Sequence, residues 1–350
     1  MAAGLLSIFG GAKRVINGSP KLSDLFPQTK PDIDGESCTH DCESCTVKYP
    51  RHFKIEDSHP LYGNIKPWST HVLVATSKSD WVRSVEDEKG SVMEAFGNAS
   101  KPSNGRLMLS ASNMPTPSNR PDYSQPTTLL LLPAFTIIEN VTPPAVPSLI
   151  TKYISRAPTT SDPLEPVSLP KTIPSSRSTV GDMIARPCPH RAIVLLCSHR
   201  TRDARCGQSA PLVKKELERH LRPLGLDRDL DDDRPGGVGI YFINHVGGHK
   251  YSANMLVYRR PDAFGIDDVQ RAKLPPGEEP QLVKPVVDEA EGSEAAGTSV
   301  VGAAQCIWLA RVRPEDCENI VKYTILQGKV VKGDKQLRGG FDRGTGLMSW

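Results

Sequence analysis

The stretch Ala192-Ile-Val-Leu-Leu-Cys197 decides the fold class of this chain. Its apolar residues follow one another without polar alternation, which is typical of a strand buried on both faces of a parallel sheet. An amphipathic helix is predicted after it, with Ser209 as the N-cap and Pro211 in the first turn. The apolar stripe of this helix consists of Leu212, Val213, Leu217 and Leu221. A buried strand followed by such a helix indicates an α/β domain.

Further elements of the same domain are predicted downstream. Strands are expected over residues 237–244, 254–258 and 305–312. A second helix is predicted from Pro314. Its apolar positions at helical spacing are Ile320, Val321 and Ile325. The order strand, helix, strand, strand, strand, helix is that of a thioredoxin-like α/β sandwich, although other α+β folds share it.

The first half of the chain carries a weaker version of this pattern. Buried strands are predicted over residues 71–76 and 129–138. Two stretches rich in Pro, Ser, Thr or Asn are predicted to be loops or linkers, namely residues 101–127 and 143–176. The run His71–Asp80 is similar in pattern to Ala192–Thr201, which suggests a degenerate second thioredoxin-like copy.

Three segments are therefore predicted. Residues 1–65 form a polar segment with a cysteine cluster, residues 66–180 a smaller α/β lobe with long Pro/Ser-rich loops, and residues 185–350 a C-terminal thioredoxin-like domain. Within the last segment, residues 262–304 are acidic, rich in Gly and Pro and without periodicity. They are predicted to be a disordered insertion.

Charge balance and hydropathy exclude two classes of partner. With 43 Lys and Arg against 40 Asp and Glu, the formal charge of +3 is too small for a protein that works by neutralising phosphates. The longest apolar run, residues 128–138, falls short of the ~18 to 20 residues of a membrane helix and is interrupted by Pro133. Neither nucleic acid nor a membrane is an expected partner.

The start of the chain lacks the apolar core and cleavage site of a secretory signal. The eight cysteines are therefore expected to be thiols or metal ligands, and the expected location is cytoplasmic. A mitochondrial location is the alternative, because residues 1–30 contain four basic residues and a single acidic one.

Four metal-competent side chains lie at the ends of predicted core elements. Cys197 ends a strand, Cys206 precedes the helix, and His245 and His249 follow another strand. The Gly-Gly pair between the histidines lets the backbone turn tightly, so that both imidazoles can point at one ion. Packing or solvation explains each residue taken singly, whereas the set of four predicts a metal site.

The spacing of the four residues leaves two metals open. Two thiolates and two imidazoles satisfy tetrahedral zinc, but the eight residues between the cysteines exceed the usual spacing of a structural zinc site. The longer loop suits a 2Fe-2S cluster, in which two histidines can replace two cysteines as in Rieske centres. A metalloprotease is excluded, because no Glu follows the first histidine as general base.

The surroundings of these residues resemble the sucrase/ferredoxin-like family. The resemblance is carried by Cys197-Ser-His-Arg-Thr-Arg-Asp-Ala-Arg-Cys206 and His245-Val-Gly-Gly-His249, and it continues at Trp308-Leu-Ala-Arg311. It implies a thioredoxin-like ferredoxin whose 2Fe-2S cluster is bound by Cys197, Cys206, His245 and His249. The word sucrase implies no glycosidase activity, because a solvated turn is the better interpretation of the acidic run Asp229–Asp233.

Mixed ligation has a consequence for the redox potential. An oxidised 2Fe-2S cluster with four thiolates carries a net charge of about −2, and two neutral imidazoles bring it to about zero. Adding an electron is then easier, so a Rieske-like potential of ~ −150 to +300 mV and a pH-dependent electron uptake are expected. Basic residues that would strengthen this effect, or dock an acidic redox partner, are Arg200, Arg202, Arg205 and Lys250.

The remaining cysteines fall into two groups. The first segment holds Cys38, Cys42 and Cys45, with His40 among them. This cluster could bind zinc or another metal, act as a redox pair, or consist of flexible thiols. Packing within core elements explains the others, Cys188, Cys306 and Cys317.

The last three residues of the sequence are Met348, Ser349 and Trp350. They resemble the tripeptide by which the cytosolic iron-sulfur assembly targeting complex recognises its clients. The alternative is that Trp350 folds back onto the core.

Three functions are compatible with these observations. The first is an electron carrier or redox sensor with a 2Fe-2S cluster, rather than an enzyme with its own substrate, serving iron or redox homeostasis or actin patch organisation. The second is a zinc-stabilised thioredoxin-like interaction scaffold. The third is a thiol oxidoreductase using Cys197 and Cys206, which is disfavoured because these cysteines lie nine positions apart rather than three.

Overall fold

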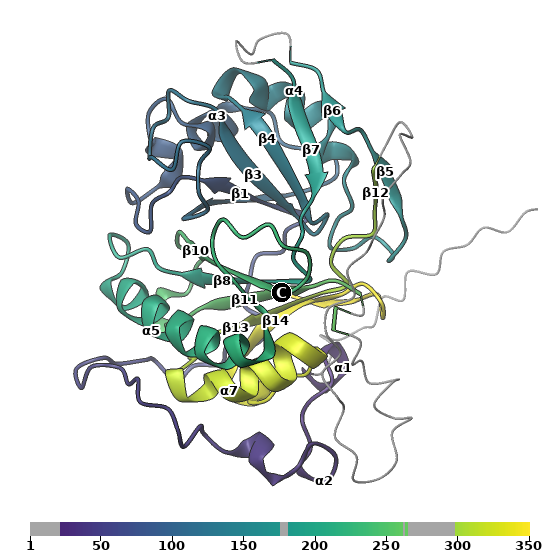
Figure 1. Cartoon of the computed structure of the whole chain (residues 1–350). Helices are drawn as coiled ribbons and strands as arrows, with labels where there is room; N and C mark the ends of the chain where they lie inside the picture. The colour runs from purple at the N-terminus through teal and green to yellow at the C-terminus, as the bar shows by residue number, and fades with distance from the viewer. Residues whose placement is uncertain (1–21, 176–180, 262, 265–297) are drawn as a thin grey trace, which may run out of the picture.

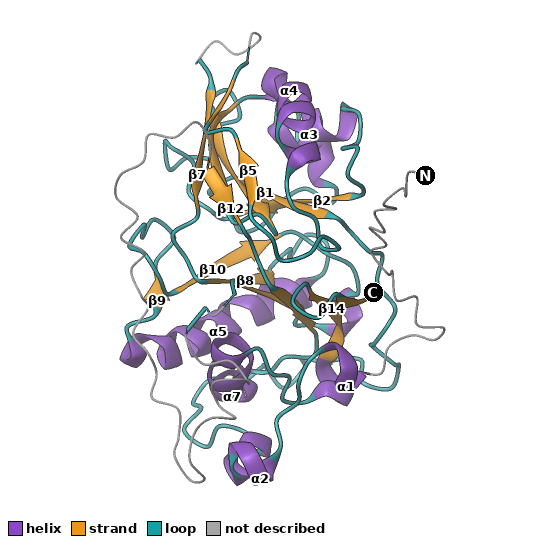
Figure 2. Ribbon diagram, turned by 90° about the vertical axis from the view of Figure 1, so that its right-hand side faces the viewer, coloured by secondary structure: helices purple, strands orange, loops and turns teal. Residues whose placement is uncertain are grey.

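The computed structural model describes residues 22–175, 181–261, 263–264 and 298–350. Figure 1 shows two lobes stacked on one another. Helices α3 and α4 cover the outer side of one lobe, α5 and α7 cover the outer side of the other, and the strands of both lobes lie between them. Figure 2 shows the same layers from the side.

The first lobe is built from short strands and two short helices. Its strands are β1 (Thr70–Ala75), β2 (Leu107–Ser112), β3 (Thr127–Leu132), β4 (Thr136–Val141), β5 (Val167–Leu169), β6 (Thr172–Ile173) and β7 (Met183–Pro187). Its helices are α3 (Val92–Asn98) and α4 (Val146–Lys152), with 3₁₀ turns η2 (Val85–Asp87), η3 (Pro143–Ala145) and η4 (Ile154–Arg156). The preceding segment contains α1 (Leu22–Leu25), α2 (Pro31–Asp34) and η1 (Glu36–Thr39).

The second lobe carries the longest described helix, α5 (Ala204–Leu221). Its strands are β8 (Ala192–Cys197), β9 (Asp227–Arg228), β10 (Val238–Ile243), β11 (Met255–Arg259), β13 (Gln305–Leu309), β14 (Leu337–Asp342) and β15 (Leu347–Ser349). The strand β12 (Thr298–Val300) follows β11 in the chain but lies beside β5 of the first lobe (Figure 1). Its other helical elements are η5 (Arg222–Leu224), η6 (His249–Tyr251), η7 (Pro314–Asp316), α7 (Cys317–Asn319), the π-helical η8 (Ile320–Ile325) and α8 (Gly333–Gln336).

One mixed sheet of 13 strands runs through both lobes, while β5 and β12 form a separate pair. The two halves of the large sheet repeat one strand order, β2-β1-β3-β4 in the first lobe and β10-β8-β11-β13 in the second. In each half the first pair is parallel and the next two pairs are antiparallel. The fold class is therefore α/β, as predicted. The strands of both lobes join in one large mixed sheet, and the repeated strand order favours the predicted duplication.

The two halves meet where β2 lies beside β10, with Ile243 opposite Ser112. Asn113 and Asn244 follow these strands, and their side chains bond across the seam in matching ways. The Asn244 Oδ1 accepts a hydrogen bond from the Ala111 amide at 3.1 Å. The Asn113 Oδ1 accepts one from the Phe242 amide at 2.7 Å. These two side-chain bonds join the halves of the sheet where β2 and β10 share a single paired position.

The core is divided by the sheet, because successive strand residues point to opposite faces. In β8, Ile193 and Leu195 belong to the apolar cluster between the two sheet halves, whereas Val194 and Leu196 belong to the cluster beneath α5. All four are fully buried. This explains why β8 has a continuous apolar sequence, and its rigid end supplies Cys197.

The predicted helix after β8 begins too late. The structure starts α5 at Ala204, where the Asp203 side chain accepts the Arg205 amide, and not at Ser209. Pro211 lies inside the helix rather than in its first turn. Asp203 is as good an N-cap as Ser209, so composition alone did not distinguish the two. Because α5 begins at Ala204, Cys206 lies within its first turn.

The first lobe contains more structure than predicted. The run 129–138 is a hairpin of β3 and β4 rather than one strand, since the chain reverses at residues 133–135. The predicted loop 101–127 contains β2, and the predicted linker 143–176 contains α4. Tertiary contacts override the local Pro and Ser signals there, because these elements bury apolar faces against the sheet.

Parts of the prediction lie outside the described residues. They include 1–21, most of the basic segment that raised the question of a mitochondrial presequence, and most of the predicted insertion 262–304. The described end of that insertion contains β12, paired with β5. The segment limits 1–65, 66–180 and 185–350 stay predictions. The cysteines assigned to packing are buried, as predicted, at Cys188, Cys306 and Cys317.

Candidate metal centre

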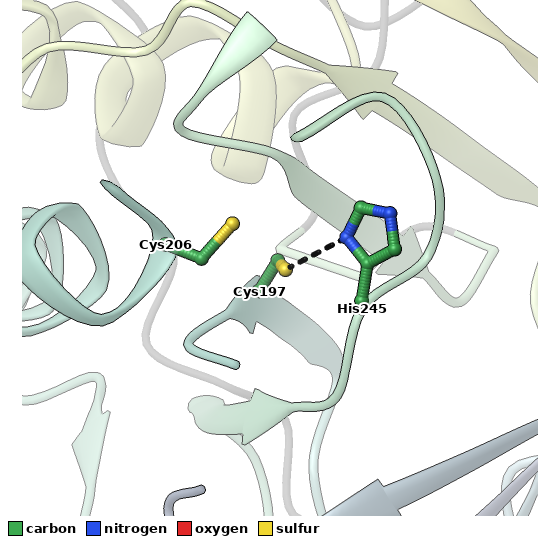
Figure 3. Close-up of side chains that lie close together, drawn as sticks. All are labelled: Cys197, Cys206 and His245. Carbon is green, nitrogen blue, oxygen red and sulfur yellow. Dashed lines mark hydrogen bonds between the residues drawn. The ribbon is translucent and has the colours of Figure 1, made fainter. Parts of the chain in front are cut away.

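Three of the four predicted ligands converge at one edge of the second lobe. Cys197 ends β8, Cys206 lies in the first turn of α5, and His245 follows β10. One ligand atom from each lies within 4.8 Å of the other two. Figure 3 shows the three side chains pointing toward one another, with 3.9 Å between Cys197 Sγ and His245 Nδ1. The parallel pairing of β8 with β10 brings the two strand ends together.

His249 lies at the rim of this group. Its ring centroid is 5.2 Å from that of His245, and 46% of its side chain is exposed. Its Nε2 lies 3.9 Å from the Asp203 carboxylate. Burial and the neighbouring His245 lower the pKa of His249, which favours the neutral form that binds metals. Ligation by all four residues stays a prediction.

The two thiols are fully buried, and the ionisation of each affects the pKa of the other. The hydrogen bond from Cys206 lowers the pKa of Cys197 well below that of a free thiol, and His245 acts in the same direction. The same hydrogen bond and burial raise the pKa of Cys206. A second thiolate here would stand unpaired beside the first in an apolar interior, so only a cation would allow both to ionise.

His199, which sequence reasoning did not single out, fixes the position of His245. The His245 amide donates to His199 Nδ1 at 3.2 Å, and His199 Nε2 lies 2.9 Å from the Trp81 carbonyl oxygen. Nδ1 therefore accepts and Nε2 carries the proton. His199 is fully buried, and it connects the ligand loop to the first lobe.

The loop after Cys197 is also tied to the first lobe. The Ser198 hydroxyl donates to the Ser79 carbonyl at 2.7 Å. The Thr201 amide and hydroxyl donate to the Asp80 carboxylate at 3.0 and 2.8 Å. The first lobe thus supports the candidate metal centre of the second, although it has Thr76 where the sequence pattern of the second lobe has Cys197.

Arg338 and Asn254 hold the loop between the two histidines. The Arg338 guanidinium donates to the Gly247 carbonyl at 3.0 Å and to Asn254 Oδ1 at 2.7 Å. The Asn254 amide donates to the Gly248 carbonyl at 3.1 Å. Arg338 is 5% exposed and stacks 4.5 Å from the Trp308 ring. The contacts come from β14 and from the residue before β11, so the sequence offered no local signal for them.

The charge of Arg338 matters for the nearby thiols. Burial lowers its pKa to about 10, and the Cys197 thiolate opposes that shift. The side chain therefore stays protonated at neutral pH. The oxygens that accept its hydrogen bonds, those of Gly247 and Asn254, are uncharged, so its positive charge is available to stabilise negative charge on the thiolates.

The donor set fits a thiolate-binding metal centre. Thiolates select zinc, copper(I) or iron-sulfur clusters, and imidazole suits zinc, copper and iron. Both sulfurs lie inside the protein and the His249 ring is exposed. The residues present can therefore hold a metal ion or cluster between the buried sulfurs and the imidazoles of His245 and His249.

Comparison with known proteins identifies the family. A model described as sucrase/ferredoxin-like matches residues 61–339. The chain belongs to the sucrase/ferredoxin-like family. The match covers both lobes and all four predicted ligands, which agrees with the resemblance seen in the sequence.

Two relatives in this comparison belong to yeasts. Actin patches distal protein 1 of Saccharomyces cerevisiae is 34% identical over 269 residues, which cover 69% of this chain and 79% of that protein. Altered inheritance of mitochondria protein 32 of Clavispora lusitaniae is 25% identical over 187 residues, 53% of this chain and 50% of that protein. No solved structure matches this sucrase/ferredoxin-like chain. Within the described residues, no helix is both long and apolar enough to cross a membrane.

Proposed function

We propose that this chain binds a 2Fe-2S cluster through Cys197, Cys206, His245 and His249 and works as an electron carrier or redox sensor. The observation that carries the proposal is the convergence of two buried thiols and one imidazole, with His249 beside them. The ferredoxin-like character of the family supports the same assignment. A role in iron or redox homeostasis, or in actin patch organisation, is part of the proposal.

The bound cluster would supply a one-electron redox couple. This chain's own residues set the conditions for it. Two thiols bring two negative charges, two imidazoles bring none, and Arg338 adds a buried positive charge nearby. Each of these features favours electron uptake relative to a site with four cysteines. The exposed His249 ring can exchange a proton with water, so electron uptake should depend on pH.

An acidic redox partner is proposed to dock at the exposed side of the centre. Arg200 and Arg202 are exposed, and Arg202 is close enough to His249 for its charge to lower the pKa of that imidazole. Arg205 contributes less net charge, because it forms a 2.7 Å ion pair with Asp203. Complementary charge would guide an acidic protein toward the imidazole side.

Cluster delivery through the cytosolic iron-sulfur assembly targeting complex, with a cytoplasmic location, is proposed from Met348, Ser349 and Trp350. A mitochondrial location is the alternative. In the structure, β15 pairs with β14, and the Trp350 ring lies 4.1 Å from that of Trp68. The tripeptide would have to leave the sheet to be recognised.

A zinc-stabilised interaction scaffold is the second candidate, and one distance favours it. Tetrahedral zinc with bonds of about 2.3 Å to sulfur and 2.05 Å to nitrogen places these atoms about 3.6 Å apart. The 3.9 Å between Cys197 Sγ and His245 Nδ1 is close to that value. Iron and acid-labile sulfide analysis of anaerobically purified protein separates the two candidates, since a zinc protein contains neither.

The ligand assignment is tested by the reduction potential. His245→Cys and His249→Cys should each keep a cluster and lower its potential toward the ~ −400 mV of all-cysteine ferredoxins, because a thiolate replaces a neutral ligand. Cys197→Ser should weaken or abolish assembly. His52→Cys is the matched control, since it adds an exposed thiol outside the ligand set. Equal potentials in the wild type and both ligand variants would refute the assignment.

A further inference from the structure

A second group of metal-competent side chains lies at the other end of α5. The segment around Cys42 packs there against α7. The Cys42 amide donates to the Glu315 carbonyl at 2.9 Å. The Asn319 side-chain amide donates to three carbonyls of the same segment, those of Ser37, Cys38 and His40. These bonds hold Cys42 next to the last turn of α5.

The donor atoms of this group are close enough to share one ion. One ligand atom each from Cys42, His220 and Glu318 lies within 4.8 Å of the other two. Cys42 Sγ and His220 Nε2 are 3.9 Å apart, again near the ~3.6 Å of a tetrahedral zinc site. Thiolate, imidazole and carboxylate are the three ligand types that zinc binds in proteins.

The cationic side chain of Arg219 already contacts two of these donors, Cys42 and His220. The Arg219 Nη2 lies 3.4 Å from Cys42 Sγ and 2.9 Å from His220 Nε2, while its Nε donates to Glu216 Oε2 at 2.8 Å. The lone pairs of a thiol, an imidazole and a carboxylate thus face one positive group. Its side chain is 38% exposed, so it can move into solvent when another cation takes its place.

Two further donors border the group. Glu216 is 1% exposed, its Oε2 lies 4.0 Å from His220 Nε2, and its Oε1 has no hydrogen-bond partner within the described residues. A buried carboxylate oxygen without a partner is costly, and a bound cation would compensate it. Cys45 follows Cys42 with the two-residue spacing of zinc-binding cysteine pairs, and its Sγ now donates to the Val47 carbonyl at 3.2 Å.

We propose that Cys42, His220 and Glu318 bind a zinc ion, with Cys45 completing the tetrahedron and Arg219 displaced into solvent. The ion would fasten the first segment to α5 and α7. Cys206 and His220 lie on the same helix 14 residues apart, which is about 21 Å at 1.5 Å per residue. The second site is therefore independent of the centre at Cys197, and it does not rest on the function proposed above.

Cobalt(II) is the probe, because tetrahedral cobalt with thiolate ligands absorbs visible light. The substitutions Cys197→Ser and Cys206→Ser remove the first centre from the whole chain. The chain with these substitutions should bind one equivalent of Co²⁺ with tetrahedral bands that Zn²⁺ abolishes. Adding Cys42→Ser should remove these bands. Adding Cys38→Ser should preserve them, since that thiol lies in the same segment but outside the site.

Arg219→Ala gives the decisive comparison. We expect it to bind zinc about tenfold tighter or more, because the ion no longer has to displace charge-assisted hydrogen bonds. Unchanged or weaker binding would show that Cys42 and His220 serve Arg219 alone, and would overturn the proposal. Absence of cobalt bands in the background chain would do the same. If the chain with Cys197→Ser and Cys206→Ser does not fold, Cys42→Ser can be made in the unsubstituted chain. There it should lower the bound zinc by one ion per chain.

Discussion

Gly248→Ala is the most direct test of how the histidine loop is held. Gly248 has φ of +68° and ψ of 42°, in the left-handed region that costs an alanine about 1–2 kcal/mol. A Cβ there would also lie 2.8 Å from Arg338 Nη2 and 2.9 Å from Arg338 Cζ. Arg338 cannot retreat easily, because it is buried against Trp308. The substitution should therefore break at least one of its hydrogen bonds to Gly247 and Asn254.

Gly247→Ala is the matched control. Gly247 has φ of +94°, but a Cβ there would meet nothing within 4 Å. Both substitutions carry the backbone cost, and only Gly248→Ala adds the loss of a charged hydrogen bond, worth about 1.5–3 kcal/mol. The difference between the two free energies of unfolding should equal that amount. The metal affinity of the centre should fall about 10- to 100-fold more for Gly248→Ala than for Gly247→Ala. This is the usual effect of losing a hydrogen bond that orients the metal ligands.

The assays are urea denaturation of the metal-free chain and competition for metal with a chelator of known affinity. Equal losses of stability and of affinity in the two variants would refute the reasoning. They would mean that Arg338 moves aside without loss and does not hold the histidine loop.

Two other predictions concern the buried His71 and the role of Trp350 in the targeting tripeptide. Burial lowers the pKa of His71 to about 3, so the unfolded chain binds more protons between about pH 3 and 6.5. The stabilisation from neutral His71 should be complete above pH 6.5 and fall by about 1.4 kcal/mol per pH unit below it. In urea denaturation across this pH range, His71→Gln should reduce the slope of the free energy of unfolding against pH by the equivalent of one proton. An unchanged slope would contradict this. Deleting Trp350 should lower the iron content of protein made in cells while leaving chemical reconstitution intact; equal iron contents would argue against the targeting tripeptide.

The local pattern of the sequence predicted four central strands of the second lobe but not β9, β14 or β15. Continuous apolar runs located β8, β10, β11 and β13 within a few residues, because a strand buried on both faces leaves no room for polar side chains. The ligand candidates followed from chemistry, since Cys and His at strand ends are informative without coordinates. The first lobe was predicted less well, because its short β2 and α4 depend on packing against neighbours rather than on their own composition.

By itself, the sequence determined the α/β class, the family and the four candidate ligands. Only the tertiary structure decided which of them meet, and what supports them. His199 contacts Trp81 across 118 positions of the chain, and Cys42 contacts His220 across 178. Periodicity reports on neighbours along the chain, whereas the first contact depends on how the two lobes stack and the second on how the first segment packs against the end of α5. The buried charge of Arg338 and the second group of donors on α5 therefore became visible only in the folded molecule.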